Sequence, residues 1–231
     1  MEVSNILYTP LDVPPPPEID TEKFLAWVRK IYPQSVKTSA SKSTAENRMP
    51  ENYPWDLVFG AYNGVWRDNF NIEFPELANY CLDAFGITAR ELLTVVFLPI
   101  RQSVTGLAFW HNDTDETGFR FYLTNEHGDK NPLLLRKIAN PLTCITKITP
   151  PIPDNHPALQ KEVYTCNFPS SRHAFYINNI KAVHSPMVTI PANRIAGFIT
   201  VKPHYLTQVR ESSEELLIRS AEKFKDYAIH W

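Results

Sequence analysis

Residues 92–123, LLTVVFLPIRQSVTGLAFWHNDTDETGFRFYL, decide the fold class of this chain. They hold three short runs of β-branched and aromatic residues, and polar turn residues separate the runs. Two further runs of the same kind are HAFYINN (173–179) and RIAGFITVK (194–202). Because no helical pattern alternates with these runs, they favour an antiparallel sheet closed into a barrel or sandwich over a parallel βαβ array.

Helical patterns flank this β-rich part. Asp20 can cap an amphipathic helix that follows it, and a second helix is predicted over 74–85, with Pro75 near its start and Gly86 at its end. A capping box precedes an apolar stripe in 212–231, which predicts a terminal helix. This last helix is also a candidate contact for a second copy of the chain, so a homodimer is an expectation.

The length of 231 residues is typical of a single domain. We expect an N-terminal arm and supporting helices in 1–90, the β core in 92–202, and the terminal helix in 212–231. A proline-rich insertion, 140–169, interrupts the core and is interpreted as a rim or lid over the site. The polyproline run Pro14–Pro17 is interpreted as an extended arm lying on its own domain.

Composition excludes several classes of protein. Lys plus Arg number 23 against 25 Asp plus Glu, for a net charge of −2, so nucleic acid is an unfavourable partner. No leader pattern and no apolar stretch of membrane-spanning length is present, which favours a cytoplasmic protein without a membrane role. Three cysteines, Cys81, Cys144 and Cys166, are too few and too scattered for a disulfide framework or a Cys-type zinc site, and are expected to be buried free thiols.

One histidine pattern points to a metal. His111 and Asp113 lie two apart after an apolar strand, so their side chains face the same way and can bind one ion together. His184, which follows the strand AFYINN, is the candidate third ligand. Two histidines and one carboxylate on one face of an ion are the ligand set of non-haem iron(II) oxygenases.

A second pair with the same spacing competes with it. His127 and Asp129 lie in NEHGDKN, where Gly128 and the flanking polar residues predict a turn rather than a strand. The distinguishing feature of the first set is Arg194, ten residues after His184 and at the start of an apolar run. A guanidinium buried there needs an anion, and its planar fork suits a carboxylate.

Together His111-Asn-Asp113, His184 and Arg194 resemble the His-x-Asp…His…Arg signature of the iron(II)/2-oxoglutarate-dependent oxygenases. The resemblance covers about residues 92–202. It implies a double-stranded β-helix, which is a jelly-roll or cupin-like barrel, with Fe(II), 2-oxoglutarate and O₂ as cofactor and cosubstrates. It also implies that Arg194 binds the distal carboxylate of 2-oxoglutarate and that a C–H bond is hydroxylated. Halogenation is disfavoured because Asp113 is kept.

A narrower likeness is to the aspartyl/asparaginyl β-hydroxylase branch of that family, which implies a carboxylate-binding role for Arg120 in GFRFYL. Tyr122 shares its face by alternation, so Arg120 and Tyr122 are candidates for binding substrate or cosubstrate. Two features depart from the branch: Asp113 stands where the branch often has Gly, and the insertion before His184 is longer.

Three functions from different classes follow. The leading hypothesis is hydroxylation of a small, carboxylate-bearing, amino-acid-like molecule. The second is hydroxylation of a protein side chain, with a groove formed by 34–53 and 140–169. The third is a cupin-like binding barrel without catalysis, which would not need the histidines, the carboxylate and the arginine together.

Overall fold

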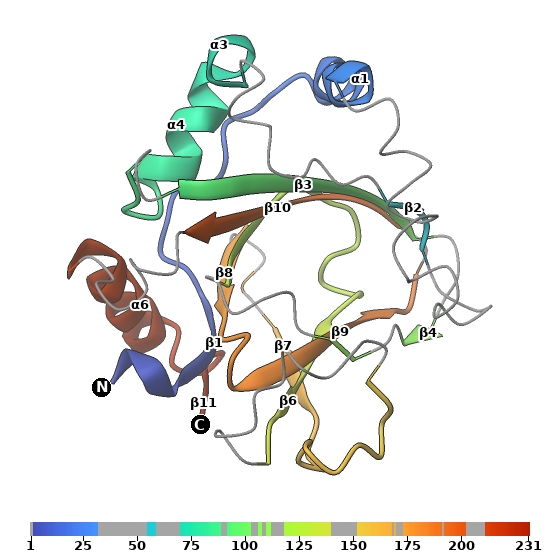
Figure 1. Ribbon diagram of the computed structural model, residues 1–231, viewed down its shortest axis with the longest axis vertical. Coiled ribbons are helices and arrows are strands. Elements are labelled where there is room, and N and C mark those ends of the chain that lie inside the picture. Colours follow the sequence, from blue (N-terminus) through green and yellow to red (C-terminus); the bar gives the residue numbers. More distant parts are fainter. Residues whose placement is uncertain are drawn as a thin grey trace.

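The computed structural model describes residues 2–31, 55–58, 70–88, 92–102, 106–107, 110–111, 118–139, 152–167, 169, 173–190, 192–201 and 211–231. In these ranges the protein consists mainly of antiparallel strands, with a few helices outside them (Figure 1). The predicted class, mainly β with flanking helices, is therefore confirmed.

The larger sheet contains seven described strands, and every neighbouring pair is antiparallel. In spatial order they are β11 (Ile229–His230), β1 (Ile6–Pro10), β8 (Ala174–Ile177), β5 (Phe119–Asn125), β10 (Ala192–Val201), β3 (Leu92–Gln102) and β2 (Trp55–Val58). The four strands β8, β5, β10 and β3 coincide with predicted runs. By contrast, β1 and β2 come from residues 1–90, where only an arm and helices were expected.

The smaller sheet faces the larger one and contains four described strands. In order they are β4 (Gly106–Leu107), β9 (Ala182–Val188), β6 (Leu133–Lys137) and β7 (Tyr164–Cys166). Beyond β4, the chain stays beside β9 through a one-residue bridge between His111 and His184. This places the first candidate ligand in the same sheet as the second.

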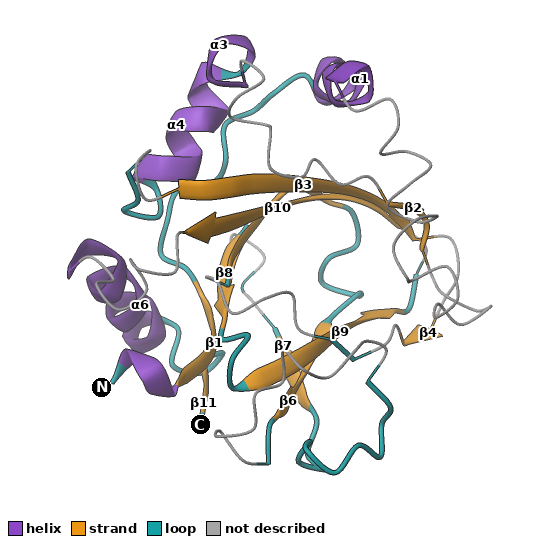
Figure 2. Cartoon of the chain, in the orientation of Figure 1, coloured by secondary structure: helices purple, strands orange, loops and turns teal. Residues whose placement is uncertain are grey.

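The route of the chain interleaves the two sheets. From β3 onward, consecutive strands alternate between them, except that β6 and β7 both lie in the smaller sheet. The last strand, β10, lies between β3 and β5, with Arg194 opposite Ile100 on one side and Asn125 on the other. The result is two facing antiparallel layers, compatible with the expected barrel or sandwich (Figure 2).

The helices lie outside the larger sheet (Figure 2). They are η1 (Val3–Asn5), α1 (Thr21–Ile31), α3 (Phe70–Glu73), α4 (Pro75–Asp83) and α6 (Glu211–Lys223). As predicted, the Asp20 carboxylate accepts a hydrogen bond from the Lys23 amide (2.9 Å), and Pro75 occupies the first position of α4. None of the described helices is long and apolar enough to cross a membrane.

An aromatic core joins these helices to the sheet. The ring of Phe24 on α1 lies 4.9 Å from the ring of Phe97 on β3, edge to face. On β5, which is separated from β3 by β10, the ring of Phe121 lies 6.0 Å from that of Phe97 and 5.3 Å from that of Tyr80 of α4. Edge-to-face aromatic pairs add to the stabilisation from buried area. This core covers the outer face of the larger sheet and leaves its inner face to the site.

The end of the chain differs from the prediction for 212–231. The helix α6 ends at Lys223, and the backbone then turns and forms β11 against β1, with Tyr8 opposite Ile229. The apolar stripe of α6 is buried in the protein's own core, at Leu216, Leu217 and Ala221. A homodimer through this helix remains a prediction.

The polyproline segment lies on its own domain, as predicted. Leu11 and Val13, which precede it, are buried. The carbonyl of Pro14 accepts a hydrogen bond from the Tyr80 hydroxyl (3.2 Å), and Asp12 forms an ion pair with Lys223 (2.8 Å). The extended segment that leads into the prolines is thus held by side chains from α4 and α6.

Candidate functional site

Two histidines lie side by side on the smaller sheet. The amide of His111 donates to the carbonyl of His184 (3.0 Å), and the amide of His184 donates to the carbonyl of His111 (2.8 Å). Directly opposed residues of an antiparallel pair project to the same face. Accordingly the two imidazole centroids are 4.4 Å apart, with 52° between the ring planes.

These imidazoles face the space between the sheets. Leu135, which is directly opposite His184 on β6, belongs to the interior cluster that also contains Tyr122 of the facing sheet. Trp110 and Val183, the chain neighbours of the two histidines, belong to a separate cluster on the other face of the smaller sheet. The alternation of a strand therefore directs both histidines inward.

The distance between the ring centres is compatible with one metal ion between the two imidazoles. With the ~2.1 Å metal–nitrogen bond of imidazole ligands, two imidazoles at right angles about an ion place their centroids about 4.5 Å apart. The observed 4.4 Å matches this value. Asp113, the expected carboxylate ligand, lies outside the described residues. Within them, no group of three or more His, Cys, Asp or Glu side chains could hold a metal.

Arg194 lies across the interior, at the start of β10. Its side chain is buried, and Nη2 donates to the carbonyl of Asn131 (2.9 Å). The guanidinium carbon is 5.7 Å from the ring centre of Tyr122. Nε has no hydrogen-bond partner, and no carboxylate in the described ranges pairs with the guanidinium. A buried cation without a counter-charge is costly, so this arrangement favours a bound anion.

A cavity of about 340 Å³ opens beside Arg194. This volume lies in the range of small-molecule sites. The cavity is lined by Tyr8, Tyr122, Asn125, His127, Gly128, Asp129, Asn131, Pro132, Leu133, Cys166, Asn167, His173, Phe175 and Arg194. One wall is fixed by the Tyr8 hydroxyl, which donates to the carbonyl of Asn167 (2.9 Å) and whose pKa is raised by burial.

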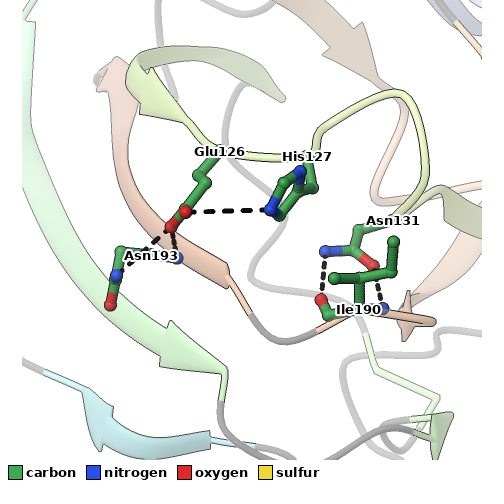
Figure 3. A network of polar contacts seen from close by, with 5 residues as sticks. All are labelled: Glu126, His127, Asn131, Ile190 and Asn193. Carbon is green, nitrogen blue, oxygen red and sulfur yellow. Dashed lines mark hydrogen bonds and ion pairs between the residues drawn. The ribbon is translucent and has the colours of Figure 1, made fainter.

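Two residues, Asn131 and Glu126, hold the turn that precedes Arg194 by hydrogen bonds (Figure 3). The side chain of Asn131 accepts from the amide of Ile190 (3.0 Å) and donates to its carbonyl (2.8 Å). The Glu126 carboxylate accepts from the amide of Asn193 (2.8 Å). Side chains of the turn between β5 and β6 are thus hydrogen-bonded to the turn between β9 and β10. The carbonyl of Asn131 also accepts the hydrogen bond from the Arg194 guanidinium. Sequence reasoning missed Asn131, because its role depends on two distant turns meeting.

Arg120 and Tyr122 share the inner face of β5, as alternation predicts, while Phe119 and Phe121 belong to the outer core. Tyr122 lines the cavity, but Arg120 is not among the described residues that do. Arg120 is buried, donates from Nη1 to the carbonyl of Gly118 (3.0 Å), and places its guanidinium carbon 4.9 Å from the ring centre of Phe198. Of the two candidates, therefore, Tyr122 lines the described cavity and Arg120 lies away from it.

The competing pair, His127 and Asp129, lies in the turn after β5, as predicted. His127 has a positive φ of 53° and its imidazole is 3.7 Å from the Glu126 carboxylate. Both residues line the cavity, as does His173, which the sequence did not single out. They form no metal-binding group with a third ligand among the described side chains.

Two of the three cysteines are described. Cys81 and Cys166 are buried free thiols, as predicted, and burial raises the pKa of both. Cys166 also lines the cavity. Cys144 lies outside the described residues.

No protein-family model matches the chain, and no curated protein matches it. Among solved structures, it is similar to a crystal structure of a prolyl-4-hydroxylase from Pseudomonas putida, with a TM-score of 0.40 and 8% sequence identity. The similarity covers 87% of this chain and 95% of that chain. A likeness of this extent does not establish a family.

Proposed function

We propose that this protein is a non-haem iron(II) oxygenase that couples oxidative decarboxylation of 2-oxoglutarate to hydroxylation of a C–H bond. In this proposal His111, Asp113 and His184 hold the iron, and Arg194 binds the distal carboxylate of 2-oxoglutarate. One observation carries it: adjacent imidazoles on one sheet face the same interior as a buried guanidinium that has no carboxylate partner in the described residues.

The strand order supports a double-stranded β-helix for the core. Numbered one to eight from β3 to β10, the strands lie in the order 1-8-3-6 in the larger sheet and 2-7-4-5 in the smaller sheet. Strands 1 and 8, 2 and 7, 3 and 6, and 4 and 5 are therefore neighbours. This is the pairing of one long hairpin wrapped into a jelly-roll barrel.

The distance between β6 and the turn before it suits a short dicarboxylate. Leu135 on β6 is opposite His184, and the carbonyl of Asn131, in the turn four residues earlier, accepts a hydrogen bond from Arg194. Four residues of chain span at most about 14 Å. A five-carbon dicarboxylate, extended by a metal–oxygen bond at one end and a hydrogen bond at the other, is of comparable length. The same molecule would supply the anion that Arg194 needs.

The chain's own groups bind and orient the ligand. Asn131 takes one of the two Nη2 hydrogens of Arg194, so one edge of the guanidinium, Nε with Nη2 or Nη1 with Nη2, can bind a carboxylate as a fork. Tyr122 packs beside that guanidinium, and the two sheets keep the site away from bulk water. Bound between the histidines, iron(II) would supply the activation of O₂ and the decarboxylation chemistry.

The proposed substrate is a small, carboxylate-bearing molecule. Its support is Arg120, a second buried guanidinium on the same inner face. Hydroxylation of a protein side chain is the alternative. Of the two loops expected to form its groove, 34–53 and 140–169, residues 34–53 and 140–151 lie outside the described ranges. A cupin-like binding barrel without catalysis is distinguished from both by the absence of 2-oxoglutarate turnover.

The test is iron binding followed by succinate formation. We expect one equivalent of Fe(II) in the wild type, and slow succinate formation from 2-oxoglutarate and O₂ without added substrate. His184→Ala removes one of three ligands and should abolish iron binding. A wild-type protein that neither binds iron nor consumes 2-oxoglutarate contradicts the proposal.

A further inference from the structure

The residue before His111 is anchored on the far side of the smaller sheet. Trp110 is only 3% exposed, and its indole N–H donates to the carboxylate of Asp154. Its carbonyl accepts from the amide of Ile152 (3.0 Å) in a one-residue bridge. Both partners belong to the insertion, so this part of it contacts the strand that carries the candidate ligand.

A buried arginine fixes the same segment. Arg136 on β6 is 5% exposed and lies opposite Val183, the neighbour of His184. Its Nη1 donates to the carbonyl of Asp154 (2.6 Å), while Nε and Nη2 donate to the carbonyl of Gln160 (2.8 and 2.6 Å). The guanidinium carbon is 5.4 Å from the ring centre of Trp110, a cation–π distance. One side chain therefore holds the segment and covers the indole.

Residues 152–160 do not form the expected rim or lid. Ile152 and Leu159 pack with Trp110 and Val183 on the face of the sheet opposite to the histidines. The reason is that Ile152 and Leu159 are apolar. They are buried against Trp110 and Val183, the chain neighbours of the two histidines, whose side chains point to the opposite face of the sheet. The remainder of the insertion before Ile152 lies outside the described residues.

Fixing Trp110 also fixes His111. Side chains of neighbouring strand residues point to opposite faces, so a tryptophan anchored outward directs the next side chain inward. His111 pairs with His184 through two backbone hydrogen bonds. A metal ligand needs a fixed orientation, because productive metal geometry tolerates errors of only about 0.5 Å.

We propose that Trp110, held by Asp154 and Arg136, is a positioning residue for His111, and that residues 152–160 are a brace for the metal site. This inference rests on the proposed function. It predicts that breaking the brace weakens metal binding more than it weakens the fold.

The decisive variant is Asp154→Ala. Its side chain is 77% exposed, so the loss removes the indole hydrogen bond and the 3.9 Å ion pair with Arg136 with little change in buried area. Changes to groups that orient metal ligands typically weaken metal binding about 10–100-fold, and we expect about tenfold here. In the metal-free protein, the His111 amide should exchange its hydrogen faster, because its bond to His184 opens more often.

Matched controls separate positioning from folding. Glu162→Ala removes another exposed carboxylate of the insertion, one that accepts from the Tyr164 hydroxyl rather than from Trp110, and should leave iron affinity unchanged. Asp154→Asn keeps an acceptor for the indole and should restore most of the affinity. Trp110→Phe keeps an aromatic ring without the donor, and should reproduce Asp154→Ala.

The outcomes are distinguishable. Wild-type affinity and wild-type His111 exchange in both Asp154→Ala and Trp110→Phe overturn the brace while leaving the proposed function intact. Equal losses of affinity in Asp154→Ala and Glu162→Ala overturn it as well, since they indicate general loosening. Failure of the wild-type protein itself to bind Fe(II) overturns the proposed function, and the brace with it.

Discussion

Replacing Arg194 by Lys tests the anion site directly. The lysine keeps the charge but loses the planar fork, so one of two charged hydrogen bonds to the distal carboxylate should be lost. A hydrogen bond to a charged group contributes about 1.5–3 kcal/mol. At about 1.4 kcal/mol per factor of ten, the dissociation constant of 2-oxoglutarate should rise about 10- to 150-fold.

Thermal unfolding with Fe(II) under anaerobic conditions measures this loss. With 2-oxoglutarate at 100 times its dissociation constant, the wild type should gain about 2.7 kcal/mol. A variant with a 50-fold weaker constant should gain only about 0.6 kcal/mol at the same concentration. For a chain of this size, the difference corresponds to a Tm lower by about 4–8 °C.

The control is Arg120→Lys. Arg120 is also buried on the inner face of the larger sheet, yet it does not line the described cavity. Its replacement should leave the ligand-induced shift in Tm close to that of the wild type. An undiminished shift in Arg194→Lys, or an equal loss in Arg120→Lys, would refute the assignment of the anion site to Arg194.

Four further outcomes are expected. Iron analysis should find no stoichiometric iron in His184→Ala but normal iron in His127→Ala, and the reverse result would transfer the metal site to the turn. In Arg120→Ala, succinate formation without substrate should persist while substrate hydroxylation falls, whereas hydroxylation at the wild-type rate would make Arg120 structural. Asn131→Ala should lower the free energy of unfolding in denaturant by about 2–4 kcal/mol, because three side-chain hydrogen bonds to Thr189 and Ile190 are lost. Burial raises the pKa of the Cys81 thiol, so the folded state disfavours the thiolate. The contribution of this thiol to the free energy of unfolding should be intact below pH 9 and should fall as the pH rises above 9. Cys81→Ala should therefore reduce the loss of stability with pH in unfolding measurements at pH 8–11.

Local rules predicted much of the fold. The period of two in GFRFYL correctly assigned Phe119 and Phe121 to one face of β5 and Arg120 and Tyr122 to the other. Cap chemistry likewise located the start of α1 after Asp20. These successes depend on patterns within a few residues, where geometry alone fixes the relation.

Strands that form only through distant partners were missed. All five residues of β1, Ile6–Pro10, are buried, so no alternation of polar and apolar residues marks the strand. Its identity comes from pairing with β8 on one side and β11 on the other. The strand β11 was missed for the same reason, because it is recognised only by its pairing with β1. The residues after α6 continue a helical pattern, and nothing in them indicates an edge strand.

The candidate site divides in the same way. The side-by-side arrangement of His111 and His184 agrees with the expectation, which rested on the resemblance to the oxygenase signature rather than on strand alternation. Their role as ligands stays a prediction, as does that of Asp113. The cavity walls at Asn131 and His173 were not predictable, because they are contributed by turns whose proximity depends on the whole barrel.

The position of β10 has a consequence for folding. This last strand of the core lies between β3 and β5, and pairs residues as distant in sequence as Val201 and Leu92. Until it is synthesised, the edges of both strands are open, and closing such long loops is slow. Arg194 lies on β10 and His184 on the strand before it. A nascent chain therefore acquires its candidate anion site only in the late step that closes the larger sheet, and truncation before Arg194 should abolish anion binding.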